Sequence, residues 1–168
     1  MFKHIPTGVE LTKTDAVIVD VPSVMRNYYK PIANRSLSYN VQGTEINTTA
    51  LYGLFQLFKR YGKHATYYFC FDTPYTRKAT DDYLKQVEIA REILAQCRFV
   101  TVEVKGLSAS DVMHLAINDA KQSHKQVYML THNQDLACRI TETTHWVHPL
   151  QKKEDIGMAN YEEMLGCP

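Results

Sequence analysis

The sequence predicts one α/β domain in which a mostly parallel sheet carries helices on both faces, a three-layer arrangement. Three short apolar runs, at residues 16–20, 66–71 and 126–131, are rich in β-branched and aromatic side chains, as buried parallel strands are. Stretches with the 3.6-residue period of helices separate these runs. Strands that alternate with helices imply right-handed crossovers, and the length of 168 residues is that of a single domain.

The first half of the chain is predicted to contain two strands, a loop and a helix. Residues 16–20 form a strand that is apolar up to its last residue. Residues 30–43 are polar and lack a clear period, which predicts a loop over the carboxyl ends of the strands. Residues 48–61 place apolar side chains on one helical face and are followed by Gly62, which is typical of a helix C-cap. Residues 66–71 form the second strand.

The second half continues the alternation. Apolar side chains recur with helical spacing over residues 81–97 and again over residues 112–121. Residues 99–104 alternate between apolar and polar side chains, so we expect this strand near an edge of the sheet. Residues 126–131 form a central strand, and residues 150–157 form a charged loop.

Charge and composition exclude some classes of function. The 19 Lys and Arg nearly balance the 18 Asp and Glu, so nucleic-acid binding would need a local basic patch. Four widely spaced cysteines lack the spacing of zinc ligands and indicate reduced intracellular thiols. No segment approaches the roughly 18 unbroken apolar residues of a membrane span, and the start lacks the apolar core of a signal peptide. We therefore expect a cytoplasmic protein without a membrane partner.

Four aspartates follow or approach the ends of predicted strands, where ligands bind in open parallel sheets. They are Asp20, Asp72, Asp111 and Asp135. Carboxylate oxygens are the ligands that Mg²⁺ and Mn²⁺ prefer, and such ions activate water for phosphodiester hydrolysis. Four carboxylates are few for two ions roughly 4 Å apart, so the number favours one ion over two.

Each aspartate also has a structural interpretation. Asp111 lies three residues after Ser108, the spacing of a capping box. Asp135 could cap a short helix that begins at the next residue, and Asp72, before a Thr-Pro pair, could form a turn. Asp20 ends an apolar strand, where a carboxylate must be paired, bound to metal or at an open rim.

Five blocks of sequence between residues 16 and 165 occur in an order that is known from one family. The blocks are Val17-Ile-Val-Asp20 with Ser23, Arg26, Tyr28 and Tyr29; Gly43 with Thr48-Thr-Ala-Leu-Tyr-Gly53; Phe69-Cys-Phe-Asp72 with Arg77 and Lys78; Lys105-Gly-Leu-Ser-Ala-Ser-Asp-Val112; and Leu130-Thr-His-Asn-Gln-Asp-Leu136. This series resembles the N-terminal domain of the 5′-nucleases, the family of flap endonucleases and polymerase-associated 5′-3′ exonucleases. The resemblance implies a PIN-like nuclease fold.

The resemblance also implies roles for individual residues. Asp20, Asp72 and Asp111 would lie at a first metal site, and Asp135, assisted by Asn133, at a second. DNA with single-stranded or branched character would be the partner. Residues that combine a basic or aromatic side chain with a position beside the presumed cleft are the candidates for contact with nucleic acid, the alternative for each being a solvated basic loop: Arg26, Tyr29, Lys30, Arg35, Arg77 and Lys78.

The sequence departs from the family pattern in three places. Ser108 and Ser110 stand where the family has carboxylates, and Asn133 replaces another. The stretch that forms a basic helical arch in the family is short here and contains Asp81 and Asp82. The chain of 168 residues stops where the family's helix–three-turn–helix module begins. We therefore expect a single domain, residues 1–168, without that module, which is either the N-terminal piece of a longer protein or a trimmed relative.

These departures lead to three hypotheses. The first is a nucleic-acid-binding 5′-nuclease domain whose metal-dependent phosphodiesterase activity is weak, altered or lost. The second is a catalytically inactive nuclease-fold scaffold that binds a protein partner in a replication or mobile-element complex. The third, a flavodoxin-like small-molecule binder, is weakened because no Gly-rich phosphate loop follows the first strand.

Overall fold

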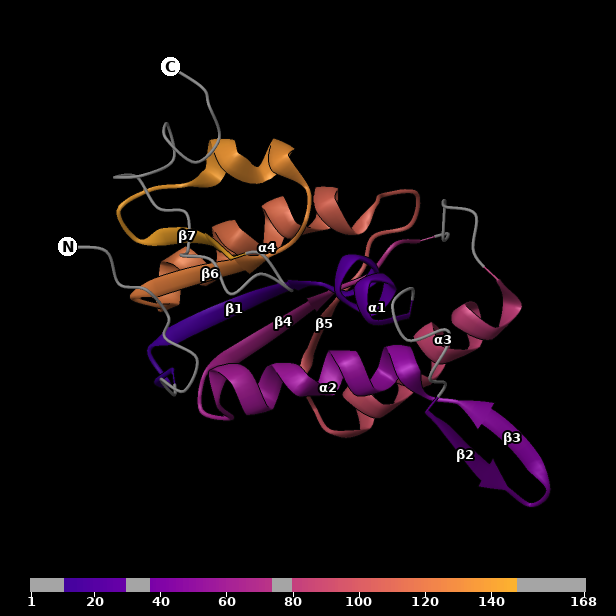
Figure 1. The fold of residues 1–168 in the computed structure, drawn as a ribbon. Coiled ribbons are helices and arrows are strands. Elements are labelled where there is room, and N and C mark those ends of the chain that lie inside the picture. Colours follow the sequence, from indigo (N-terminus) through magenta and orange to yellow (C-terminus); the bar gives the residue numbers. More distant parts are fainter. Residues whose placement is uncertain (1–10, 30–36, 74–79, 148–168) are drawn as a thin grey trace.

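A five-stranded parallel sheet forms the centre of the computed structural model, which describes residues 11–29, 37–73 and 80–147. The strand order is β5-β4-β1-β6-β7, and every neighbouring pair is parallel (Figure 1). The strands are β1 (Asp15–Asp20), β4 (Thr66–Cys70), β5 (Val100–Val102), β6 (Gln126–Leu130) and β7 (Thr144–Val147). In these ranges no helix is long and apolar enough to cross a membrane.

Helices cover both faces of the sheet (Figure 1). One face carries α1 (Val21–Tyr29), α2 (Thr49–Tyr61) and α3 (Asp81–Gln96), and the other carries α4 (Ala109–Ser123) and the 3₁₀ helix η1 (Gln134–Arg139). Side chains of β1 alternate between the two cores: Val17 and Val19 pack toward α1, α2 and α3, whereas Ala16 and Ile18 pack toward α4. All four are fully buried. The predicted three-layer α/β class is confirmed.

Most predicted elements lie within a few residues of the observed ones. The strand predicted at residues 99–104 is β5, and it lies at an edge of the sheet as expected. The helix predicted from residue 112 begins earlier, at Ala109, because Ser108 provides the N-cap. Gly62 follows α2 with a positive φ of 82°, a backbone conformation that favours glycine.

The loop predicted over residues 30–43 is wrong for its described part. Residues from 37 onward form a hairpin of β2 (Ser38–Val41) and β3 (Thr44–Asn47). Gln42 and Gly43, with φ of 52° and 85°, make the two-residue turn, whose positive φ values suit a tight hairpin. The hairpin projects beyond the start of α2, away from the sheet, and does not cover the strand ends (Figure 1).

One strand was not predicted, and one predicted loop lies outside the described residues. Strand β7 was not among the predicted strands, although it completes the sheet beside β6. The loop predicted at residues 150–157 lies outside the described residues, as do residues 30–36 of the first loop.

Gly53 allows α1 and α2 to approach closely, and its replacement by alanine is expected to destabilise the fold. A Cβ at Gly53 would lie 2.0 Å from Cγ of Tyr28, far inside contact distance. Overpacking of this kind costs about 1–3 kcal/mol, so Gly53→Ala should lower the free energy of unfolding by that amount in urea titrations. In a Tyr28→Gly background the same change should cost much less, because Cβ and Cγ of Tyr28, which both overlap the new Cβ, are absent. Equal costs in the two backgrounds would contradict the prediction.

Candidate metal and nucleic-acid site

Asp20 and Asp72 lie at the carboxyl ends of the two adjacent strands β1 and β4. Asp20 pairs with Cys70 in the parallel register, and Asp72 follows two residues later. Both side chains are buried, at 2% and 5% exposure. Because side chains alternate along a strand, Asp20 lies on the face of Ile18, which is the face that packs against α4.

Hydrogen bonds occupy both carboxylate oxygens of Asp20. Oδ1 accepts from the backbone N–H of Ser23 at 3.0 Å, and Oδ2 accepts from Ser23 Oγ and Thr131 Oγ1, both at 2.7 Å. Asp20 therefore acts as the N-cap of α1, with its charge near the positive end of the helix dipole. Burial, and next the negative charge of Asp20, raises the pKa of the neighbouring Cys70 thiol, so Cys70 stays protonated near neutral pH.

Thr131, which follows β6, is a site residue that the sequence analysis missed. Its hydroxyl donates to Asp20 and also accepts from Asn133 N–H at 3.0 Å. Its carbonyl accepts from Trp146 Nε1 at 2.8 Å. One signal could have identified it: Thr131 ends the β6 run as Asp20 ends the β1 run.

Only one carboxylate oxygen of Asp72 has a hydrogen-bond partner in the described part of the chain. Its Oδ1 accepts from the backbone N–H of Ala109 at 2.6 Å, which places it at the N-terminal end of α4. The adjoining loops are also joined, because Thr73 N–H donates to the Leu107 carbonyl at 3.1 Å. The other oxygen, Oδ2, is buried and has no hydrogen-bond partner in the described part of the chain. A buried carboxylate oxygen without a partner is unfavourable and indicates a missing cation or donor.

Asp111 has the capping role that its spacing predicted. Ser108 Oγ accepts from Asp111 N–H at 3.3 Å, and Asp111 Oδ2 accepts from Ser108 N–H at 3.0 Å, which completes a capping box. Oδ2 also accepts from the Ser108 hydroxyl at 2.6 Å. These bonds, the hydroxyl first and the backbone next, lower the pKa of the Asp111 carboxyl. Asp111 is exposed, and a metal role for it stays a prediction.

Replacing Ser108 by alanine should weaken the start of α4. Loss of an N-cap hydroxyl costs about 1 kcal/mol, which urea unfolding at pH 7 would measure. The folded-state pKa of Asp111 lies below its unfolded value, so its contribution is present above the unfolded pKa and is lost as pH falls through the folded pKa. The difference between wild type and Ser108→Ala should therefore shrink in strongly acidic buffer. A difference that is constant with pH would contradict the coupling.

Asn133 and Asp135 both belong to the start of η1. Asn133 Oδ1 accepts from Asp135 N–H at 3.0 Å, so the N-cap is Asn133 and the expected cap at Asp135 is displaced by two residues. Asp135 lies exposed in the first turn. Neither residue is hydrogen-bonded to Asp20 or Asp72 in the ranges that the structure covers.

Two of the six candidate nucleic-acid contacts can be described, and both take part in packing between α1 and α3. The Tyr29 hydroxyl bonds Thr80 Oγ1 at 3.0 Å and Asp82 Oδ2 at 3.2 Å. The Arg26 guanidinium lies 6.0 Å from the centre of the Tyr83 ring. The other four lie outside the described residues: Lys30, Arg35, Arg77 and Lys78.

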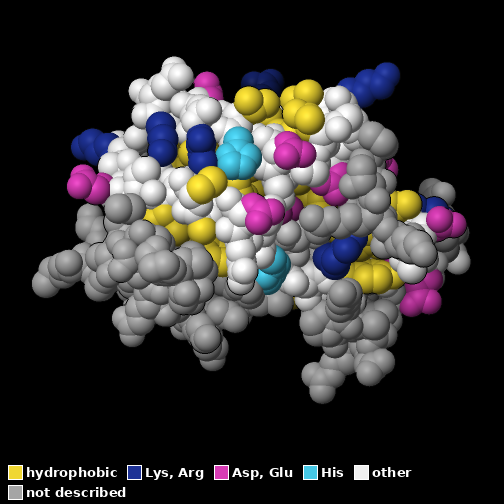
Figure 2. All heavy atoms as spheres, turned by 90° about the horizontal axis from the view of Figure 1, so that it is seen from above, with side chains coloured by type: hydrophobic (Ala, Val, Ile, Leu, Met, Phe, Trp, Pro, Cys, Tyr) yellow, Lys and Arg dark blue, Asp and Glu magenta, His cyan; other side chains and the backbone are white. Residues whose placement is uncertain are grey.

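The surface above α4 and η1 carries charges of both signs. Figure 2 shows Lys and Arg side chains scattered among Asp, Glu and His on this face, without one extended basic patch among the described side chains. This mixture agrees with the near-zero net charge of the chain. Attraction of a polyanion to this face would have to come from a few local contacts.

The described residues contain no group of three or more His, Cys, Asp or Glu placed to hold a metal ion together. Asp72 Oδ2 is nevertheless a buried oxygen that lacks a partner, and it follows the strand next to Asp20. Oxygen donors of this kind suit Mg²⁺ or Mn²⁺. One ion rather than two stays a prediction.

Comparison with known proteins gives a family match and a fold match. The sequence model of the family described as "5′-3′ exonuclease, N-terminal resolvase-like domain" matches residues 15–166. A crystal structure of a bacteriophage T5 protein co-crystallised with metal ions is similar, with a TM-score of 0.61 and 14% identity over 89% of this chain and 59% of that chain. No curated protein matches the sequence.

Two further T5 structures share the fold. A pseudo-enzyme–product complex of the flap endonuclease with DNA and metal ions has a TM-score of 0.61 and 10% identity, and the match covers 89% of this chain and 60% of that one. A zinc-bound 5′-exonuclease has a TM-score of 0.59 and 12% identity over the same shares, 89% and 60%. The chain thus spans about 60% of the length of these structures.

Proposed function

The chain belongs to the family of 5′-3′ exonuclease N-terminal, resolvase-like domains, and from this premise we propose that it binds DNA of single-stranded or branched character and cleaves it weakly with one divalent ion. The fold is that of a nuclease domain related to 5′-3′ exonucleases and flap endonucleases. The T5 flap endonuclease was solved with DNA and metal ions, which supports the proposal.

One observation carries the proposal, the unpartnered buried oxygen of Asp72 beside the strand that ends in Asp20. A buried negative charge is unfavourable unless a cation or hydrogen bonds compensate it. Mg²⁺ or Mn²⁺ would compensate it, held by Asp72 and Asp20. Asp111, Asp135 and Asn133 are the further ligands that the family resemblance suggests.

In the proposed cleavage the ion would activate water, and residues of the chain would orient the metal ligands and bind the phosphate. A bound divalent ion lowers the pKa of an attacking water and neutralises charge that develops on the leaving oxygen. Ser23 and Thr131 orient Asp20, and the first turn of α4 orients Asp72. Arg77 and Lys78 are proposed to hold the scissile phosphate, as basic side chains do in nucleic-acid complexes.

The remaining basic and aromatic candidates would guide the DNA strand toward the site: Arg26, Tyr29, Lys30 and Arg35. Weak activity is expected because the capping box engages Oδ2 of Asp111 and Asn133 offers only a neutral amide oxygen, which leaves few carboxylates to neutralise an ion. The free cysteines Cys70, Cys97 and Cys138 fit a reducing compartment, and a cytoplasmic location is part of the proposal.

A second candidate function is an inactive nuclease-fold scaffold that binds a protein partner. A specific observation favours it: the hydrogen bonds from Ser23 and Thr131 satisfy both oxygens of Asp20 without any metal. In this case Asp20 would be a buried helix cap, and no ion would bind.

Titration of Mn²⁺ by calorimetry on wild type and Asp72→Asn, with cleavage of labelled flap DNA, tests the proposal. We expect one ion per wild-type chain, and a rise in unfolding free energy of about 2.7 kcal/mol at a free Mn²⁺ concentration of 100 Kd. Asp72→Asn should lose the binding, the stabilisation and the cleavage together. The control Asp119→Asn makes the same chemical change at an exposed position on α4 and should retain all three. Wild-type protein without binding or cleavage would support the scaffold instead.

A further inference from the structure

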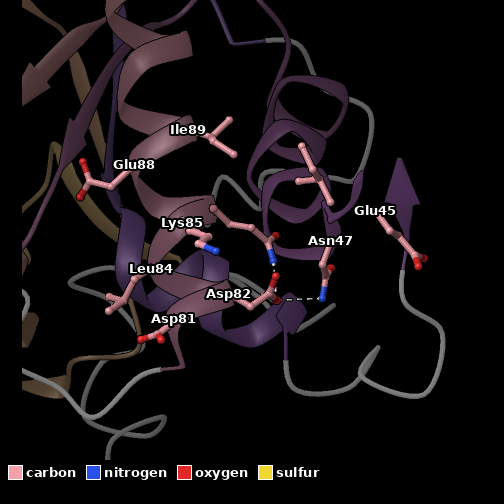
Figure 3. Close-up of a pocket in the computed structure, with 10 residues that line it drawn as sticks. Glu45, Asn47, Asp81, Asp82, Leu84, Lys85, Glu88 and Ile89 are labelled. Atoms are coloured by element: carbon pink, nitrogen blue, oxygen red, sulfur yellow. Dashed lines mark hydrogen bonds between the residues drawn. The ribbon is translucent and has the colours of Figure 1, made fainter. Parts of the chain in front are cut away.

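A groove with a volume of about 650 Å³ lies between strand β3 of the hairpin and helix α3. Figure 3 shows its two sides, with Asn47 and Asp82 facing each other. The lining residues belong to β3 and to the part of α3 from Asp81 to Ile89. None of them is hydrogen-bonded to Asp20 or Asp72 in the described ranges.

Hydrogen bonds hold the two sides of the groove together. Asp82 Oδ2 accepts from Asn47 Nδ2 at 3.0 Å and from Gln86 Nε2 at 3.3 Å. The Asn47 bond joins β3 directly to α3. A groove that is already formed loses less conformational entropy when a ligand binds.

Apolar side chains and a free strand edge border the groove. Ile46, Leu84 and Ile89 line it and remain partly exposed. Strand β3 pairs only with β2, and no other described strand lies on its second side. An extended peptide can add to such an edge by main-chain hydrogen bonds while its side chains fill adjacent apolar positions.

The charges of the lining indicate the occupant. Glu45, Asp81 and Glu88 are exposed acidic groups on the groove, and among its described lining residues Lys85 is the exposed basic one. Glu88 is partly neutralised by Arg91 at 2.7 Å. The remaining negative charge disfavours the phosphates of nucleic acid and favours Lys and Arg side chains.

We propose that this groove binds an extended segment of a partner protein in which basic residues alternate with apolar ones. The apolar side chains contact Ile46, Leu84 and Ile89, and the basic ones lie near Glu45 and Asp81. The inference does not require metal or DNA, although Asp82 of the groove also accepts from the hydroxyl of Tyr29 at 3.2 Å, a residue proposed above to guide DNA.

Fluorescence anisotropy with a labelled synthetic peptide, Lys-Leu-Lys-Ile-Lys-Val-Lys, tests the proposal on the full chain. The wild type should bind it, and replacing the three apolar residues by serine should weaken binding at least ~10-fold. Glu45→Lys should also weaken binding ~10-fold. The control Glu142→Lys changes the net charge equally at an exposed residue before β7 and should change binding less than about twofold.

Three results would overturn the proposal. The first is absence of binding to the wild type, and the second is equal loss in the Glu45 and Glu142 variants, which would mean non-specific charge attraction. The third is competition by a single-stranded oligodeoxynucleotide for the same groove. Thermal unfolding of Glu45→Lys should match the wild type, because Glu45 is exposed on the hairpin, so a loss of binding would not come from unfolding.

Discussion

Replacing Asp20 by asparagine is expected to abolish Mn²⁺ binding and metal-dependent cleavage of flap DNA while the chain stays folded. Asparagine is as good an N-cap as aspartate, so its amide oxygen can still accept from Ser23 N–H at the start of α1. The amide NH₂ then stands in the place of Oδ2 and cannot accept from Ser23 Oγ or Thr131 Oγ1. Loss of these two bonds should lower the free energy of unfolding by about 1–3 kcal/mol. Loss of groups that only support metal ligands lowers metal affinity 10–100-fold, so loss of a ligand should cost at least ~100-fold.

The variant Asp20→Ala separates the capping role from the metal role. Alanine removes every hydrogen bond of the carboxylate and leaves the donors of Ser23 and Thr131 unpaired in a buried place, so we expect a loss of about 3–5 kcal/mol in urea unfolding. Calorimetry and cleavage assays on Asp20→Asn then report the metal role without unfolding. Unchanged Mn²⁺ binding or cleavage in Asp20→Asn would contradict the assignment of Asp20 as a ligand.

Asp20 and Asp72 could be located from the sequence because each follows an apolar run that predicts a buried strand. The parallel pairing of β1 with β4 brings the two residues together, since the carboxyl ends of adjacent parallel strands meet at one edge of the sheet. Thr131 ends an apolar run in the same way, but the sequence does not show that its strand lies beside the strand of Asp20. Thr131 reaches Asp20 across 111 positions of sequence, and only the pairing of β1 with β6 brings the two together.

The hairpin was missed because its strands carry little apolar alternation. Among the described strands β2 and β3 pair only with each other, most of residues 38–47 are polar, and Tyr39 is 68% exposed. The turn signal was weak as well, since Gln42 takes a positive φ that Asn or Asp adopts more often. Strand β7 is short and begins in a Thr-rich stretch, so its two buried apolar residues, Trp146 and Val147, do not form a recognisable apolar run.

Gln86 illustrates a long-range interaction that no local pattern predicts, and Gln86→Leu is expected to have the largest effect on stability away from the candidate site. Its Oε1 accepts from the backbone N–H of Ala50 at 2.8 Å and of Leu51 at 3.4 Å, in the buried first turn of α2. Its Nε2 donates to Asp82. The N-cap residue of α2, Thr48, makes no side-chain capping bond, so the amide of Gln86 satisfies donors that a cap would otherwise satisfy.

Leucine at position 86 would keep the volume and remove both polar functions. Two amide donors at the start of α2 would lose their acceptor inside the protein, at about 1–3 kcal/mol for a fully buried donor. We expect a loss of about 2–4 kcal/mol in the free energy of unfolding, measured by urea titration with circular dichroism. Gln122→Leu, the same change at an exposed position of α4, should stay within about 0.5 kcal/mol of wild type. If the two variants lost equal stability, the network that joins α2, α3 and the hairpin would not contribute, and the groove between β3 and α3 would have to be held by packing alone.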